Sequence, residues 1–361
     1  MNDTISDYRA EFANLLRDTW IPAGYDNNSK LAQYAKLNGY IRESMPKSLF
    51  RYRPPVERNI TAFANNRILV TKPSEMGDVF DSLITVDVER VIESINNMEN
   101  RKDELTEFFF QGQQLPKPVL RHVSRGIRRA VLKNQNRVKG NIAARLAMKH
   151  VTSLVASDLR EQAKMKLDTA IDILRNTGYI ACFCEERDNL KMWSDYADKH
   201  KGFVVEYDFE SLNARLPTVD LGKKHRQPDY IVLPVIYGEQ YDSTDLVLFL
   251  LMNGLVKKYA DKAHYYVKLH DELWCMKGYL YKSNDYKTED EWRLITPMNG
   301  TSPNSNPFSS VDAKPKAIYY GAAIKDGDFQ KLDEAAIRNG VTRYRMNINT
   351  VNQSVVAEEL Q

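Results

Sequence analysis

The chain has 361 residues, more than one average domain of ~100–200 residues, and is long enough to bury a sizeable core. Hydrophobic residues make up 43%, aromatic residues 10% and charged residues 27%, a balance that excludes a disordered or fibrous protein. The 51 Lys and Arg nearly balance the 48 Asp and Glu, so the formal net charge of +3 identifies no class of partner. Three cysteines, a polar N-terminus and a longest apolar run of seven residues predict a cytoplasmic protein that does not enter a membrane.

The N-terminal part of the chain changes from helical to extended patterns. Apolar residues at helical spacing predict two short helices within residues 7–43, separated by a turn at residues 22–24. Alternation from Leu49 to Arg53 then predicts a strand, which ends at two consecutive prolines. A short helix and a second strand over residues 67–71 are expected to follow.

Residues 87–177 form a long predicted helical block whose two halves carry opposite charge. Residues 87–107 contain seven acidic and three basic residues, whereas residues 121–149 contain nine Lys or Arg and no acid. Six of the basic residues form two adjacent rows on one predicted helix: Arg121, Arg125, Arg128, Arg129, Lys133 and Arg137. Nucleic acid, the acidic half of the block or a neighbouring subunit would each relieve their repulsion, and these alternatives stay open.

Strand patterns return after Gly178. The predicted strands are residues 179–184, 202–208, 231–236, 291–296 and 317–320, and the predicted helices between them are residues 190–199 and 245–281. Residues 297–315 are rich in Ser, Asn and Pro and predict an exposed loop. Because the strands flank long helical blocks, the predicted fold class is α+β: a small, mostly antiparallel sheet with flanking helices and a large helical insertion.

The same changes of pattern suggest where the chain divides. The predicted regions are an N-terminal helical segment (1–47), the first part of the α+β core (48–86), the helical insertion (87–177), the main part of the core (178–335) and a C-terminal strand and tail (336–361).

Several standard chemical signatures are absent from the sequence. It contains no Gly-rich phosphate loop, no Gly-x-Ser-x-Gly elbow and no His-Glu-x-x-His motif. Cys182 and Cys184 lack a second cysteine pair, so they predict small core residues on one strand face and not a zinc site. The six histidines are scattered, and no metal site is predicted from them.

Two arginines share one face of the first predicted strand. Arg51 and Arg53 are two residues apart, so alternation places them on one face and Tyr52 on the other. Two guanidiniums on one face can bind a phosphate or a carboxylate. The alternative is an edge strand whose arginines pair with nearby acids.

An aromatic stripe marks the predicted helix at residues 190–199. Trp193, Tyr196 and His200 fall at i, i+3 and i+7, and Gly202 is expected to end the helix. Such a stripe most often packs into a core. At the lip of a cleft, the Trp and Tyr rings would instead stack on a flat ligand.

Paired carboxylates occur beside the predicted strand at residues 291–296. Glu289, Glu291 and Arg293 are expected to share one strand face, while Trp292 enters the core. Two neighbouring carboxylates repel each other unless a cation or a function balances them. A salt-bridged structural face and a catalytic pair therefore both fit this pattern.

These clusters together resemble a widespread bacterial family of unknown function. Its members share a Tyr-Arg strand, an Asn-Asp-Pro-Phe turn, a Met-Trp-x-x-Tyr helix and a Glu-x-Glu-Trp-Arg strand. The segments that carry the resemblance are Phe50–Arg53, Gly77–Asp81, Met192–Gly202, Lys282–Arg293 and Ile318–Gly321. The resemblance spans about residues 48–86 and 179–325, and it departs from the family where Gly77 and Val79 replace Asn and Pro.

The order of these motifs is similar to the layout of ADP-ribosyltransferase folds, although their middle Ser-Thr-Ser strand is not visible here. The resemblance implies an enzyme that cleaves NAD, as a transferase or a glycohydrolase, in a toxin or anti-phage defence system. Glu291 would be the catalytic carboxylate and Glu289 the acceptor-side one. Arg51 or Arg53 would hold the pyrophosphate of the cofactor NAD, and Trp193 or Tyr196 would stack on its nicotinamide. Replacing Glu291 by Gln would then lower turnover ~10²-fold and change stability little.

Two other functions are kept open. In the first, six acids gather a Mg²⁺ site for a nuclease: Asp78, Asp81, Glu206, Asp208, Glu289 and Glu291. In the second, the protein is a non-enzymatic sensor that binds nucleic acid or a protein partner, or associates with itself, through the basic rows. NAD cleavage, metal-dependent nicking and salt-sensitive nucleic-acid binding distinguish the three functions.

Overall fold

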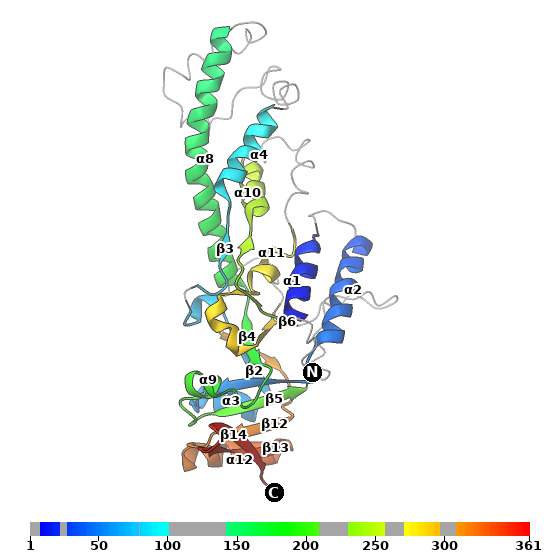
Figure 1. Ribbon diagram of the computed structural model, residues 1–361, viewed down its shortest axis with the longest axis vertical. Coiled ribbons are helices and arrows are strands. Elements are labelled where there is room, and N and C mark those ends of the chain that lie inside the picture. Colours follow the sequence, from blue (N-terminus) through cyan, green and yellow to red (C-terminus); the bar gives the residue numbers. More distant parts are fainter. Residues whose placement is uncertain are drawn as a thin grey trace.

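The computed structural model describes residues 8–21, 27–78, 80–100, 142–208, 230–256, 271–296 and 308–361. Figure 1 shows a body built around a β-sheet, from which an arm of helices projects. The fold class is α+β with a mostly antiparallel sheet, as the sequence predicts. Among the described residues, no helix is both long enough and apolar enough to span a membrane.

Ten strands form the main sheet, and only β12 and β13 pair in parallel. The strands are β1 (Ser48–Arg53), β2 (Arg67–Thr71), β4 (Ile180–Cys184), β5 (Phe203–Asp208), β6 (Ile231–Pro234), β10 (Glu291–Ile295), β11 (Phe308–Asp312), β12 (Ala317–Tyr320), β13 (Thr342–Asn349) and β14 (Ser354–Glu359). The sheet forks at β4. One edge of β4 pairs with β10 along its whole length, while the other pairs with β1 at Cys184 and with β2 at Ile180.

The remaining elements are short strands, 3₁₀ turns and helices. They are α1 (Tyr8–Asp18), α2 (Asn27–Ser44), α3 (Glu57–Ala64), η1 (Pro73–Glu75), β3 (Ile84–Thr85), α4 (Val88–Asn100), α8 (Ile142–Thr177), α9 (Leu190–Asp195), β7 (Ile236–Tyr237), β8 (Tyr241–Asp242), α10 (Thr244–Val256), α11 (Trp274–Gly278), β9 (Tyr281–Lys282), η3 (Asn284–Glu289) and α12 (Asp326–Asn339). β3 pairs with β8 and β7 pairs with β9, both in parallel.

The two faces of the sheet bury different cores. The larger core lies against the face that carries Trp292 of β10 and Phe203 of β5. The smaller core lies on the opposite face, where Trp193 of α9 packs over Tyr52 of β1. Because side chains alternate along a strand, register decides which core each residue of β1, β4 and β10 enters.

The arm consists of α4, α8 and α10, which Figure 1 shows side by side above the body. It has a small apolar cluster of its own, made by Val91, Ala163, Val247, Leu248 and Leu251. The described parts of residues 87–177 are therefore helical. The division into five regions stays a prediction.

Three predicted elements differ from the structure. Part of the segment expected as loop is β11, which pairs with β2 through the backbone although only Phe308 and Val311 of its five side chains are apolar. The helix expected at residues 190–199 ends at Asp195, and it does not resume because residues 198–200 have positive φ angles, which a right-handed helix excludes. The helix expected at residues 245–281 is divided into α10 and α11, and β9 begins at Tyr281.

Candidate acid–base site

Two carboxylates share one buried lysine at the start of β10. The Lys282 Nζ of β9 donates to Glu289 Oε2 at 2.6 Å and to Glu291 Oε2 at 2.7 Å. Glu289 is 3% exposed and Glu291 2% exposed. Glu289 lies at the end of η3, and the left-handed backbone of Asp290 turns it toward the same lysine as Glu291. The lysine is the balancing cation that the paired carboxylates require.

Arg293 extends this cluster toward the base of the arm. Its Nε donates to Glu291 Oε1 at 2.7 Å, and its two terminal nitrogens bind the two oxygens of Asp81 at 2.7 and 2.6 Å. Arg293 also donates to the carbonyl of Tyr279, and Ser82 Oγ donates to Asp81. The cluster is thus a continuous chain of charge-assisted hydrogen bonds, the strong class in proteins.

The pKa values of the two glutamates are shifted in opposite directions. Burial raises the pKa of Glu289 above its ordinary value, and the nearby Glu291 charge adds to this effect against the attraction of Lys282. Burial would also raise the pKa of Glu291, but the Arg293 and Lys282 charges outweigh it and hold that pKa well below its ordinary value. With Asp81, three carboxylates face two cations, so the cluster carries one surplus negative charge when all are ionised. Of the two glutamates, Glu289 takes a proton more readily.

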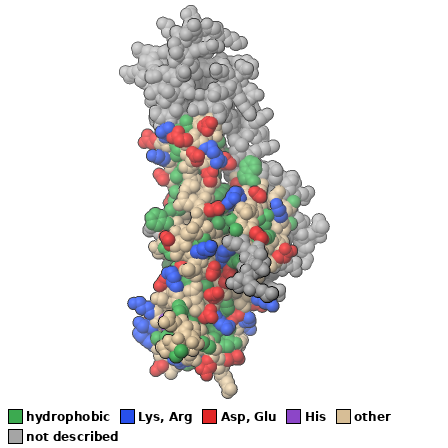
Figure 2. Space-filling view, in the orientation of Figure 1, with side chains coloured by type: hydrophobic (Ala, Val, Ile, Leu, Met, Phe, Trp, Pro, Cys, Tyr) green, Lys and Arg blue, Asp and Glu red, His purple; other side chains and the backbone are tan. Residues whose placement is uncertain are grey.

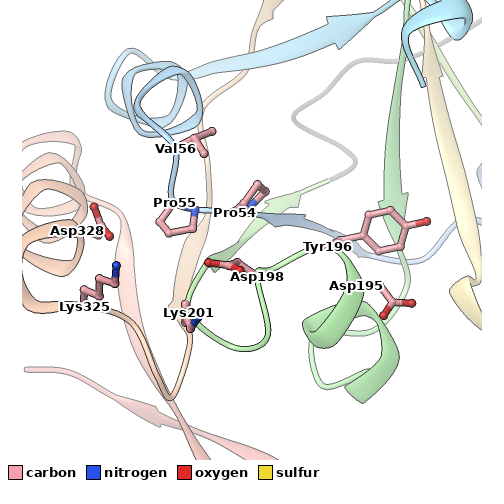
Figure 3. A pocket seen from close by; sticks show the side chains of 9 residues that line it. All are labelled: Pro54, Pro55, Val56, Asp195, Tyr196, Asp198, Lys201, Lys325 and Asp328. Atoms are coloured by element: carbon pink, nitrogen blue, oxygen red, sulfur yellow. The ribbon is translucent and has the colours of Figure 1, made fainter. Parts of the chain in front are cut away.

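Tyr196 connects the cluster to the surface. Its hydroxyl donates to Glu289 Oε1 at 2.7 Å, and the residue is 40% exposed. It also lines a cavity of about 510 Å³ between the end of β1, the turn after α9 and the start of α12 (Figure 3). The cavity is lined by Pro54, Pro55, Val56, Asp195, Tyr196, Asp198, Lys201, Lys325 and Asp328.

Charges of both signs lie on the walls of this cavity. In Figure 3, Lys201 and Lys325 lie toward α12, whereas Tyr196 and Asp195 lie at the other end. Asp195 is paired with Lys191 at 2.5 Å. Within the part of the chain that the structure describes, neither lysine of the cavity forms an ion pair. Asp328 lies beside Lys325 and Asp198 beside Lys201 in Figure 3, so one end of the cavity carries charges of both signs and the other carries the Tyr196 ring.

The structure places the other aromatic candidate, Trp193, in the smaller core. The indole is fully buried, stacks on the His200 ring at 5.7 Å and meets the Tyr52 ring edge-on. Its Nε1 donates to the carbonyl of Arg187. Both faces of the indole are thus covered by protein, and only Tyr196 of the predicted pair lies at a cavity.

Arg51 and Arg53 do not meet the glutamates. Register pairs Phe50 with Cys184 and Cys184 with Glu291, so these three residues share a face and the two arginines lie on the opposite one. Arg51 lies against Phe183 in the larger core, with its guanidinium 5.7 Å from that ring. The sheet therefore does not bring the two arginines and the two glutamates into one site.

The six acids considered for a metal do not gather either. No group of three or more metal-ligating side chains occurs among the residues that the structure describes. Asp81 and Glu291 are separated by Arg293, and Glu206 accepts instead from Ser48, Lys316 and Tyr319. Cys182 and Cys184 lie on one face of β4, and burial raises the pKa of both thiols.

The basic rows from Arg121 to Arg137 lie outside the described residues. On the face shown in Figure 2, acidic and basic side chains alternate over the body of the molecule.

Two parts of the site were missed from the sequence. Asp81 was considered only as a metal ligand, and its bidentate pairing with Arg293 joins residues 212 positions apart. Lys325 lies in no motif, and Lys201 lies in the resemblance segment Met192–Gly202 without a chemical signature that marks it. The turn that contains Asp81 belongs to the segments that carry the family resemblance, and this was the available signal.

The site is thus a buried acid–base cluster at the start of β10, a strand that lies between β4 and β6 in the sheet. Residues 192–294, which contain α9, β9 and β10, match the family described as a protein of unknown function (DUF2971). This match confirms the predicted resemblance to an uncharacterised family over that segment. No curated protein and no solved structure matches the chain significantly.

Proposed function

We propose that the chain is an enzyme that cleaves an N-glycosidic bond in a nucleotide of the NAD type, with Glu289 as its acid–base group. The observation that carries the proposal is the pair of glutamates on one lysine, whose surroundings move their pKa values apart. Such a split pair is typical of acid–base catalysis, and in glycoside cleavage a carboxylate stabilises the oxocarbenium-like transition state.

Roles follow from exposure. Glu289 reaches the surface through Tyr196, whereas Glu291 has both oxygens bound by buried cations. Glu291 is therefore a positioning residue, which fixes Lys282 and Arg293. In the proposed reaction the bond between ribose and nicotinamide breaks and its electron pair leaves with nicotinamide. An oxygen of water or of an acceptor bonds to the ribose carbon, and its proton passes to Glu289. The Tyr196 hydroxyl must first release the carboxylate.

The cavity beside Tyr196 supplies the binding site in this proposal. Its volume of about 510 Å³ falls within the usual range of ~300–1,000 Å³ for small-molecule sites. Lys201 and Lys325 would take the phosphates, and the Tyr196 ring would contact the base or nicotinamide. The phosphate role in this site thus passes from Arg51 and Arg53 to the two lysines.

Nicotinamide release tests the proposal. The purified full chain is incubated with NAD across a pH series, and free nicotinamide is measured by chromatography. We expect wild type to release it and Glu289→Gln to do so about 10²-fold more slowly. Asp285→Asn, on the exposed surface of the same 3₁₀ turn, is the matched control and should keep wild-type activity. Equal rates in wild type and Glu289→Gln would contradict the role of Glu289, and intact NAD throughout would contradict the substrate.

We further propose that the protein acts in the cytoplasm, in a defence or toxin system, and that the basic rows bind nucleic acid. The support is their charge, since nine basic residues occur between positions 121 and 149 without an acid. Binding should fall steeply with salt because phosphate contacts release counterions. Reversal of Arg125, Arg129 and Lys133 to Glu should abolish binding to mixed-sequence DNA and RNA, and unchanged binding would contradict it.

A further inference from the structure

Arg51 and Arg53 place two guanidiniums on the core-facing side of β1. Their strand partners on β5 are Val205 and Phe203, both members of the larger core. Arg51 is 5% exposed, and Arg53, at the end of the strand, is partly exposed. Two residues along a strand separate the attachment points of these side chains by ~6.6 Å.

These guanidiniums have few partners among the described residues. Arg51 donates one hydrogen bond, from Nη2 to the carbonyl of Leu69 at 2.5 Å, where the sheet forks between β1 and β2. Its Nε is buried without a hydrogen-bond partner. No carboxylate in the described part of the chain forms an ion pair with either arginine. Burial lowers the pKa of Arg53 to about 10. The Cys182 thiol and the Tyr207 hydroxyl oppose this shift and the Arg58 cation adds to it, while no carboxylate contributes.

Arg293 of the same sheet shows what a buried guanidinium requires. It binds two oxygens of Asp81, one of Glu291 and the carbonyl of Tyr279. Burying a charge without such partners costs several kcal/mol, which is why buried charges are almost always paired. Arg51 and Arg53 are adjacent on one face and lack the anions that Arg293 has. An anion from outside the described chain would supply what is missing.

We propose that Arg51 and Arg53 together bind a phosphate group, at a site separate from the acid–base cluster. Two guanidiniums match the double negative charge of a phosphate, and each presents several donors in a planar fork. The partly exposed Arg53 gives the direction of entry. The Arg51 and Arg53 side chains lie on the face of the sheet opposite to that of Glu291.

Thermal unfolding of the full chain tests the site. A ligand that binds only the folded state raises the melting temperature with its concentration. We expect inorganic phosphate to raise it relative to chloride at equal ionic strength, and Arg53→Gln to remove the shift. Arg67→Gln, an exposed arginine of β2, should keep the shift. Glycerol phosphate is the second probe: a shift with it as well identifies a phosphate ester as the ligand class, whereas a shift with inorganic phosphate alone identifies the free ion.

Two further variants keep the result interpretable. Lys201→Gln combined with Lys325→Gln removes the cations of the cavity beside Tyr196, and the phosphate shift should survive it. Arg51→Met removes the buried charge and should abolish the phosphate shift. Its melting temperature in chloride should fall less than the melting temperature of a variant that loses one partner of a buried ion pair. The proposal is overturned if phosphate gives wild type no shift, or if the shift depends on the two lysines and not on Arg53.

Discussion

Glu291→Gln measures how strongly the fold depends on the buried cluster. Glu291 is almost fully buried, and its oxygens accept from Arg293 Nε and Lys282 Nζ at 2.7 Å each. Glutamine keeps the volume but offers one oxygen to two cations, so its amide group must face one of them. Breaking a buried ion pair by removing one partner costs about 3–5 kcal/mol. We expect Glu291→Gln to lower the free energy of unfolding by about this amount, a large part of a typical ~5–15 kcal/mol.

This result differs from the expectation based on size and packing alone, in which the same substitution changes stability little. Urea unfolding at neutral pH, followed by tryptophan fluorescence, checks it. Glu289→Gln is the matched control. We expect it to cost about 1 kcal/mol or less, because burial and the Glu291 charge outweigh the attraction of Lys282 and raise the pKa of Glu289, so a neutral side chain loses little there. A second arm adds Lys282→Met to Glu291→Gln, since contacting residues should give a non-additive double mutant. Equal losses for the two glutamine variants, or simple additivity with Lys282→Met, would refute the reasoning.

Three other outcomes follow from the contacts of Glu289, Tyr196 and Glu206. Because the pKa of Glu289 is raised in the folded state, its contribution to stability is present below its ordinary value of 4.5 and is lost as pH rises through the folded pKa. The free energy of unfolding of wild type, measured from pH 4.5 to 8, should therefore fall relative to that of Glu289→Gln. Parallel curves for the two proteins would contradict this. Tyr196→Phe removes a hydrogen bond that lowers the pKa of Glu289, so the acid limb of the pH–rate profile for NAD cleavage should move to higher pH. The free energy of unfolding should change by about 1 kcal/mol or less. An unchanged acid limb would show that Tyr196 does not act on the catalytic group. Although burial opposes it, three donors lower the pKa of Glu206, so the stabilisation by Glu206 is present above pH 4.5 and is lost as pH falls. Glu206→Gln should lower the free energy of unfolding by about 1–3 kcal/mol at pH 7 and by much less in acid. Unfolding curves of wild type and variant at the two pH values check this.

Local pattern predicted the elements well and their mutual faces poorly. Alternation correctly placed Arg51 and Arg53 on one side of a strand, and β1 runs over nearly the expected residues. Whether that side is also the side of Glu291 depends on the register of β1 and β10 against β4, which joins segments more than a hundred residues apart. Two strands can each be predicted correctly while a site that combines residues of both is predicted wrongly. A shift of one residue in the pairing register moves every side chain of a strand to the other face of the sheet.

The aromatic helix shows a second limit. Helical spacing placed Trp193 and His200 on one stripe, and their rings do stack, but the helix ends at Asp195. Contact is made because left-handed residues fold His200 back over the indole. Gly202 then lies where an added Cβ would come 2.1 Å from the Arg53 carbonyl. Such a turn depends on close backbone packing against β1, and the sequence of α9 alone does not contain that information.

Helix α8 packs into both the core of the body and the apolar cluster of the arm, and so it connects the two. Ala163 belongs to the small cluster of the arm, whereas Ala170 and Leu174 belong to the core of the body, and Leu167 packs against both. The helix has 36 residues and is therefore ~54 Å long at 1.5 Å per residue. Its inner end is clamped by Tyr279, whose hydroxyl donates to the Leu174 carbonyl and whose own carbonyl is held by Arg293. Tyr279 therefore joins the inner end of α8 to Arg293 of the charged cluster through two hydrogen bonds, so a displacement of the arm that tilts α8 acts on a residue bound to the cluster.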